Sequence, residues 1–280
     1  MPTSEQADGA DTIVYRRHAW PIRLMHWINV VAFAVLLMSG LQIFNAFPAL
    51  HWGKSSYTGE APLLRIGARL DADGKAVGVT RIFGRDFETT GVLGVSAGAD
   101  GAPTVRGFPA WITLPGEQWL AMARRWHLFF AWVLVVNGLL YLGYTLASGH
   151  LARDLLPDRA DWRGFGQSLK DHLLFRRPAG EAERRYNVLQ KLAYLAVIFV
   201  LFPLVVVMGL AMSPALNALL PGWVDVVGGR QSARTLHFVL AWMLVAFVFI
   251  HVFELVVSGF WNKLRAMVTG RYRLEGDRDA

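Results

Sequence analysis

The sequence predicts an all-α membrane protein, a bundle of four transmembrane helices with an extracytoplasmic insertion between the first two. Three observations predict this class. Only 18% of the 280 residues are charged, against roughly 25% in a soluble domain. Four charge-free stretches are each long enough to cross a bilayer, which takes about 20 residues. The 11 Trp and 17 Phe residues supply the aromatic side chains that gather at membrane interfaces.

The charge-free stretches predict helices over about 24–45, 120–147, 190–212 and 234–258. The first is too long for the apolar region of a cleavable signal peptide, which spans roughly 7–15 residues, and no small-residue cleavage site follows it. Residues 13–265 therefore form the helical domain. An arm over 1–12 is expected to be disordered, and a tail over 266–280 follows the domain.

The insertion over 46–118 is rich in glycine and turn residues. Between these lie short runs with β propensity, such as 76–79 and 81–83. We expect a small extracytoplasmic cap with weak strands. A connection of this length often has a function of its own.

Positive charge sets the orientation of the helices. Four spans place both termini and the loop after the second helix on one side, and that side carries 17 of the 28 Lys and Arg residues. Both termini are therefore expected in the cytoplasm, with the protein spanning the plasma membrane. The net charge of +7 is a topology signal, and nucleic-acid binding is only a remote alternative.

Four of the eight histidines fall inside the predicted spans, and ionisable residues in a bilayer commonly mark function. His237 and His251 share the fourth helix and are 14 residues apart. This spacing separates them by about 21 Å along the axis and leaves them about 40° apart around it. One helix thus offers an imidazole near each membrane face. By depth, His127 pairs with His237 near the outer face, and His26 pairs with His251 near the cytoplasmic face.

Two imidazole pairs at two depths suit two six-coordinate haems. The chain has no cysteine, so disulfides, iron–sulfur clusters and covalently attached haem are excluded, and the haems would be of the b type. A zinc or copper site would need more ligands at one level. A structural histidine bonded to a neighbouring helix is the other interpretation.

Small residues and arginines lie near the four histidines. Ser39, Gly40, Gly138 and Gly143 leave room for a flat macrocycle, although glycine is common in membrane helices. Four arginines lie at depths suited to haem propionates and could equally serve topology and snorkelling: Arg23, Arg124, Arg125 and Arg234.

Two segments resemble a known family, the di-haem cytochrome b membrane subunits of bacterial Ni/Fe hydrogenases, formate dehydrogenases and thiosulfate-reductase-like molybdoenzymes. The first is Trp20-Pro21-Ile22-Arg23-Leu24-Met25-His26-Trp27, and the second is Arg185-Tyr186-Asn187-Val188-Leu189-Gln190-Lys191. The resemblance covers about residues 13–265. It implies one haem ligand on each of the first two helices and two, 14 residues apart, on the fourth, which matches the four histidines above. The insertion over 46–118 is longer than the connection of the formate dehydrogenase type.

The resemblance also implies a quinone, ubiquinone or menaquinone, beside the cytoplasmic haem. Asn187 matches the family's asparagine at that pocket, although asparagine is equally a favoured N-cap residue. His18, Tyr186 and Gln190 lie on the same side and are candidate contacts or proton donors, with a solvated surface position as the alternative for His18.

The resulting hypothesis is an electron-transfer subunit between a periplasmic oxidoreductase, of the molybdopterin type, and the quinone pool. The partner would dock on the 46–118 insertion and the 213–232 loop. A stand-alone cytochrome serving a soluble carrier is the alternative, and a non-redox transporter or scaffold ranks last because Pro203 is the only break in a span. The chain would carry electrons for a complex, and whether it is itself an enzyme stays open.

Overall fold

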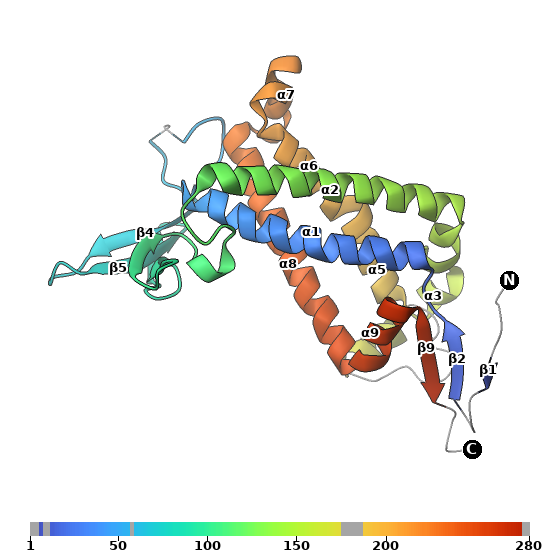
Figure 1. Cartoon of the computed structure of the whole chain (residues 1–280). Coiled ribbons are helices and arrows are strands. Elements are labelled where there is room, and N and C mark those ends of the chain that lie inside the picture. Colours follow the sequence, from blue (N-terminus) through green and yellow to red (C-terminus); the bar gives the residue numbers. More distant parts are fainter. Residues whose placement is uncertain (1–5, 8–11, 57–58, 175–186, 276–280) are drawn as a thin grey trace. The chain divides into compact units, whose positions relative to one another are not determined.

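The computed structural model describes residues 6–7, 12–56, 59–174 and 187–275 (Figure 1). Within these residues four segments are long and apolar enough to cross a membrane, which confirms the predicted fold class. Three are single helices: α1 (Trp20–Asn45), α2 (Leu120–Ala147) and α8 (Arg230–Val257). The third span comprises α5 (Val188–Ala196), the π-helical turn η4 (Val197–Leu201) and α6 (Phe202–Ala211).

Helices α1 and α8 each begin four residues earlier than predicted, because they extend beyond the apolar runs that define the predicted spans. Arg23 and Arg234 lie inside α1 and α8, since backbone hydrogen bonding continues past the apolar run into the interface. Pro21 lies in the first turn of α1. Backbone N–H groups in the first turn have no acceptor within the helix, so the lack of an N–H on proline costs no hydrogen bond there. Large apolar side chains remain exposed for lipid to cover, among them Phe129 at 63%, Trp132 at 66% and Phe249 at 73%.

The break that the sequence indicates at Pro203 is a local widening of the third span. Pro203 directly follows Phe202, the first residue of α6, and it cannot donate to the carbonyl four residues earlier. The π-helical turn η4 precedes it. In such a turn the hydrogen bonds reach one residue further along the chain, so the helix continues although proline cannot donate.

The chain forms two compact units, and each contains a part of all four spans. The first comprises Met1–Ile28, Asn137–Phe202 and Met243–Ala280. The second comprises Asn29–Val136 and Pro203–Trp242.

In the first unit, the two ends of the chain form one antiparallel sheet in the order β1 (Gln6–Ala7), β2 (Thr12–Arg16) and β9 (Arg271–Glu275) (Figure 1). The expected disorder of the arm over 1–12 is therefore wrong for Gln6–Ala7 and for Thr12. The 266–280 tail is likewise structured through Glu275, because α9 (Phe260–Thr269) leads directly into β9. Tyr272, 1% exposed, packs on Tyr15 with ring centroids 5.6 Å apart.

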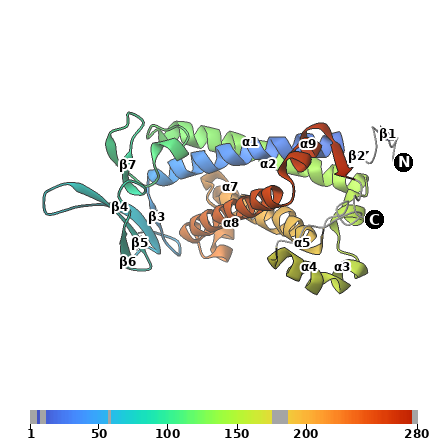
Figure 2. The same cartoon turned by 90° about the horizontal axis from the view of Figure 1, so that it is seen from below.

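Short helices join the second and third spans in the same unit. They are the π-helical turn η2 (Leu151–Leu155), α3 (Arg159–Arg163) and α4 (Phe165–Leu173), and α3 and α4 lie beside α5 (Figure 2). Lys191 of α5 is shielded from solvent and bonds the Asp161 carboxylate at 2.7 Å. This ion pair ties the connecting helices to the start of the third span.

In the second unit, the insertion folds as a cap of two antiparallel sheets. Four strands pair in chain order, β3 (Ala49–Leu50), β4 (Leu64–Leu70), β5 (Ala76–Ile82) and β6 (Arg85–Glu88). A hairpin of β7 (Gly94–Ala97) and β8 (Pro103–Arg106) and the short helix η1 (Ala110–Ile112) follow. The loop before α8 holds α7 (Pro214–Leu219) and η5 (Trp223–Val227). The strand expected at 76–79 is present within β5.

The cap is anchored to the end of α1. Leu41 and Phe44 form a buried apolar cluster with Leu50, Ile66 and Phe108. Beside it, the Arg106 guanidinium, 4% exposed, donates to the carbonyls of Phe108 and Gly116, to Thr113 Oγ1 and to Gln42 Oε1 of α1. Burial lowers the pKa of Arg106 from its ordinary value. The planar Arg106 guanidinium thus supplies hydrogen-bond donors to several oxygens of the cap and of α1.

Candidate functional site

In the second unit, the rings of His127 of α2 and His237 of α8 lie next to each other edge-on, with centroids 6.1 Å apart and planes inclined at 68°. The Nδ1 of each ring bonds a backbone carbonyl of another helix. His127 Nδ1 lies 3.1 Å from the Leu36 oxygen of α1, and His237 Nδ1 lies 2.8 Å from the Val205 oxygen of α6. A carbonyl only accepts, so Nδ1 carries the proton on both rings and Nε2 keeps its lone pair.

In the first unit, His26 of α1 and His251 of α8 form a second pair, with centroids 6.4 Å apart and planes inclined at 60°. Aromatic rings surround them: Trp27 lies edge-on to His26, and Phe247 stacks on His251 at 5.8 Å. The structure thus brings together the same two pairs that depth along the helices predicts.

The separation within each pair fits one metal ion between two imidazoles. Two metal–nitrogen bonds of about 2 Å each span about 4 Å. The distance from each nitrogen to its ring centre adds about 1.2 Å on both sides, which gives roughly 6.4 Å between centroids. Within the described residues no group of three or more His, Cys, Asp or Glu side chains could hold a metal ion. Two ligands per level suit an ion whose other positions come from a macrocycle, as in haem.

Small residues make room for the pair in the second unit. A Cβ on Gly40 would lie 3.3 Å from His127 Cε1, and Ser39 Oγ lies 3.1 Å from His127 Nδ1. Gly209, which the sequence did not indicate, takes the same position against His237, where a Cβ would again lie 3.3 Å from Cε1. Gly209 follows Val205 by four residues, as Gly40 follows Leu36, but this spacing has meaning only once the carbonyl that each histidine bonds is known. A Cβ on Gly138 or Gly143 meets nothing within 4 Å.

Two of the four arginines expected near propionates contact backbone carbonyls. Arg23 Nη1 donates to the Val268 oxygen at 2.5 Å, close to the end of α9. Arg234 donates to the carbonyls of Ala49 and Phe47 and lies over the Phe47 ring, and so holds the start of the cap. Arg124 and Arg125 are exposed on the first turns of α2.

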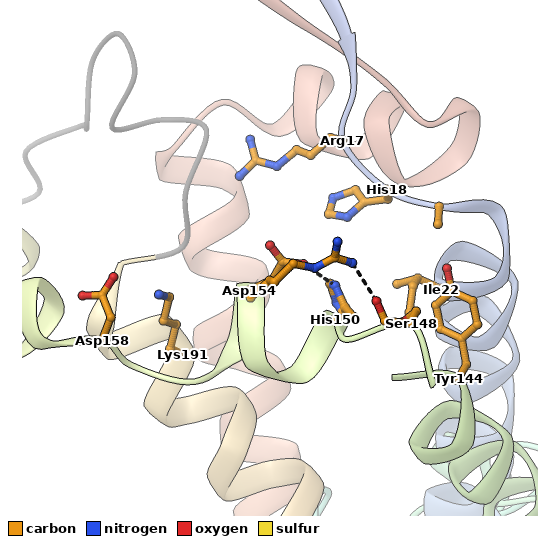
Figure 3. A pocket seen from close by; sticks show the side chains of 11 residues that line it. Arg17, His18, Ile22, Tyr144, Ser148, His150, Asp154, Asp158 and Lys191 are labelled. Atoms are coloured by element: carbon orange, nitrogen blue, oxygen red, sulfur yellow. Dashed lines mark hydrogen bonds and ion pairs between the residues drawn. The ribbon is translucent and has the colours of Figure 1, made fainter. Parts of the chain in front are cut away.

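A cavity of about 530 Å³ lies in the first unit, between the start of α1, the end of α2 and η2 (Figure 3). Its wall is polar and includes Arg17, His18, Tyr144, His150 and Lys191. His18 is half-buried, which corrects the alternative of a solvated surface position. Burial, and then the positive charge of Arg17, lower the pKa of His18 to about 4.

Of the other residues expected at a quinone pocket, Asn187 and Gln190 form the capping box of α5. Asn187 Oδ1 accepts from the Gln190 N–H at 2.8 Å, and Gln190 Oε1 accepts from the Asn187 N–H at 3.3 Å. The N-cap role that the sequence left open for Asn187 is therefore present. Neither residue lines the cavity. Tyr186 lies outside the described residues.

Two histidines outside the four spans, His51 and His150, also have defined surroundings. His51 is only 9% exposed and stacks on Phe47 in the cap. His150 lines the cavity, and its Nδ1 bonds the Asp154 carboxylate at 2.6 Å (Figure 3). The spacing of four residues between His150 and Asp154, one helical turn, is the sequence signal for this pair.

Comparisons with known proteins agree with this architecture. A family model described as prokaryotic cytochrome b561 matches residues 17–270. A putative protein-methionine-sulfoxide reductase subunit, YedZ1, of Azospira oryzae is 28% identical over 239 residues, which cover 85% of this chain and 89% of that protein. No solved structure matches the chain. A cytochrome b carries haem without covalent attachment, as a chain without cysteine requires. With a match over most of its length and four apolar spans, this membrane protein belongs to the prokaryotic cytochrome b561 family.

Proposed function

We propose that the chain is a di-haem membrane subunit that carries electrons between a periplasmic oxidoreductase and the membrane quinone pool. The observation that carries the proposal is the pair of adjacent imidazoles in each unit, with ring centroids 6.1 and 6.4 Å apart. In this proposal His127 and His237 would hold one haem b, and His26 and His251 would hold the other. Haem iron changes reversibly between ferric and ferrous states and so accepts or releases one electron at a time.

Backbone carbonyls of neighbouring helices orient the two imidazoles of the second unit. The carbonyls of Leu36 and Val205 fix the Nδ1–H tautomer of His127 and His237, so that Nε2 is the atom offered to iron. The exposed Arg124 and Arg125 remain candidate propionate partners. Arg23 and Arg234 would reach a propionate only by sharing donors that now contact backbone carbonyls.

We place both termini in the cytoplasm. Support comes from the excess of Lys and Arg in the terminal segments and the loop after α2. The pairing of β2 with β9 also puts the two ends of the chain side by side, as an even number of spans requires. In this orientation the His127–His237 pair lies near the periplasmic face.

The polar cavity is our candidate quinone site. Arg17 Nη1 and Ser148 Oγ are buried in its wall and have no hydrogen-bond partner among the described residues, so a quinone carbonyl or water can satisfy them. Reduction of a quinone consumes two electrons and two protons. His18, with a pKa of about 4, is neutral at pH 7, so in this proposal it contacts a quinone carbonyl through a ring N–H and is not the source of these protons.

The periplasmic partner is proposed to dock on the cap and on the loop that holds α7 and η5. The name of the Azospira oryzae relative supports a reductase partner, because it describes that protein as a subunit of a protein-methionine-sulfoxide reductase. A partner of the molybdopterin type is the class that the resemblance implies. A stable periplasmic subunit that co-purifies with this chain would support this proposal over a stand-alone cytochrome.

The haem content of the purified protein tests the proposal. We expect about two low-spin haem b per chain in mild detergent, as two bis-histidine sites imply. His237→Ala and His26→Ala should each lose one haem and keep the other. His51→Gln changes a buried histidine outside both pairs and should keep both haems. A colourless protein, or full haem content in His237→Ala, would refute the assignment.

A further inference from the structure

The two imidazoles of the second unit are held by the same arrangement on two different helices. His127 bonds the Leu36 carbonyl, and Gly40, four residues later, lies against its ring. His237 bonds the Val205 carbonyl, and Gly209, again four residues later, lies against its ring. In a helix each of these carbonyls also accepts from the N–H of that glycine. The absence of a Cβ lets each imidazole come close enough to share the carbonyl.

Ser39 adds a further acceptor at His127. Its hydroxyl donates to the Val35 carbonyl at 2.6 Å, so its proton is already used. The Ser39 oxygen lies 3.1 Å from His127 Nδ1, equal to the distance from the Leu36 oxygen. The Nδ1–H of His127 is therefore shared between two acceptors. Ser39 is completely buried, and water does not compete for this contact.

The pair in the first unit has no such acceptors. Among the residues that the structure describes, the contacts of the His26 and His251 rings are aromatic, with Trp27, Phe247 and Tyr194, and neither ring has a hydrogen-bond partner. Both sites thus offer two imidazoles. They differ in that, within the described part of the chain, Nδ1 is hydrogen-bonded to backbone carbonyls only in the second unit.

This difference acts on iron through the ligand. An imidazole whose Nδ1–H is hydrogen-bonded to a carbonyl is a more basic ligand, and a more basic ligand stabilises ferric over ferrous iron. We propose that the His127–His237 site holds the haem of lower reduction potential, with Ser39, Gly40 and Gly209 as positioning residues. The inference rests on the proposed function. It places a single electron at equilibrium on the His26–His251 site, in the unit that contains the polar cavity.

Spectroelectrochemical titration of the haem-loaded protein tests this order. The haem left in His26→Ala, bound by His127 and His237, should titrate at lower potential than the haem left in His237→Ala. Ser39→Ala should raise the lower potential and leave the higher one unchanged, because only His127 loses an acceptor. Ser39→Thr keeps the hydroxyl and should restore the wild-type value.

Matched variants separate this effect from packing. Ser232 is also completely buried in the second unit, but it bonds the backbone of Gly53 and Gly228. Ser232→Ala should therefore move neither potential. Gly209→Ala should raise the lower potential by displacing His237 from its carbonyl. Gly143→Ala adds a methyl group in open space and should have no effect.

The outcomes distinguish the two proposals. Fewer than two haems in the wild-type protein would overturn the proposed function and this inference with it. Two haems in the reverse order of potential, or no response of either potential to Ser39→Ala, would overturn the inference alone.

Discussion

At the scale of single residues, His18 shows how the fold determines the protonation of a side chain. The sequence places it before the first span, where a solvated position and a pocket position are both compatible with its neighbours. In the structure it lines a cavity beside Arg17, and its pKa falls from 6.5 to about 4. Burial is the larger cause, because it removes water from the charged imidazolium.

This shift predicts a loss of stability in acid. Below pH 6.5 the unfolded chain binds a proton at His18, whereas the folded chain does so only near pH 4, so the free energy of unfolding falls as the pH is lowered between these values. The full loss is about 3 kcal/mol. Thermal unfolding in detergent at pH 7 and pH 5 should show a smaller acid shift for His18→Gln than for wild type. Equal shifts would contradict the prediction.

The histidine pairs follow from the sequence, but their hydrogen-bond partners do not. Depth along a helix depends only on the rise per residue, and the charged residues that flank each span fix its level. The contacts of His127 with Leu36 and of His237 with Val205 depend on how each helix is rotated about its axis. Membrane helices are apolar on all sides, so their sequence carries little information on rotation. This is why Gly209 was missed.

At the scale of elements, the cap depends on close approaches between strands. Gly94, in β7, has φ +80°, and a Cβ there would lie 2.1 Å from the Gly67 oxygen of β4. A Cβ on Gly78 of β5 would likewise lie only 2.3 Å from the Leu93 oxygen. Backbone therefore packs directly on backbone where β7 crosses the larger sheet. The richness in glycine predicted an irregular cap, but the crossing depends on strand pairing that no local pattern indicates.

These contacts predict that two glycines of the cap respond differently to substitution. Gly94→Ala should destabilise the cap by about 2–4 kcal/mol, because it combines a left-handed backbone with overlap against a neighbouring strand. Gly67→Ala, whose added methyl group meets nothing within 4 Å, should cost less than about 0.5 kcal/mol. Limited proteolysis of the 46–118 segment measures both. Equal resistance of the two variants would argue against this packing.

At the scale of the whole molecule, the sequence predicted the number and limits of the spans and missed the joining of the two ends. Charge-free runs locate apolar helices directly, so the predicted spans needed only small extensions. The ladder between β2 and β9 pairs Arg16 with Arg271 and Thr12 with Glu275. Each strand is only five residues long, so neither sequence indicates that its pairing partner lies at the other end of the chain.

The joined ends predict a large effect for one aromatic residue. Tyr272→Ala should destabilise the first unit by about 3 kcal/mol or more, because it empties a buried site between Tyr15 and Ala266. Arg273→Ala changes an exposed neighbour on the same strand and is the control. Protease cleavage near residue 16, measured in the two variants, should be fast only in Tyr272→Ala. Similar cleavage of both would refute the role of this contact.

The same ladder has a consequence for the order of assembly. β2 leaves the ribosome before the first span, and β9 leaves it after the fourth, so the partners in the ladder are separated by about 255 positions along the chain. The edge of β2 that pairs with β9 must therefore remain open while all four helices enter the bilayer, although the other edge can already pair with β1. A chain in which one helix failed to insert would carry β9 on the opposite side of the membrane and could not complete the sheet. Closure of this sheet is thus the step of biogenesis that distinguishes a correctly threaded chain from a misthreaded one.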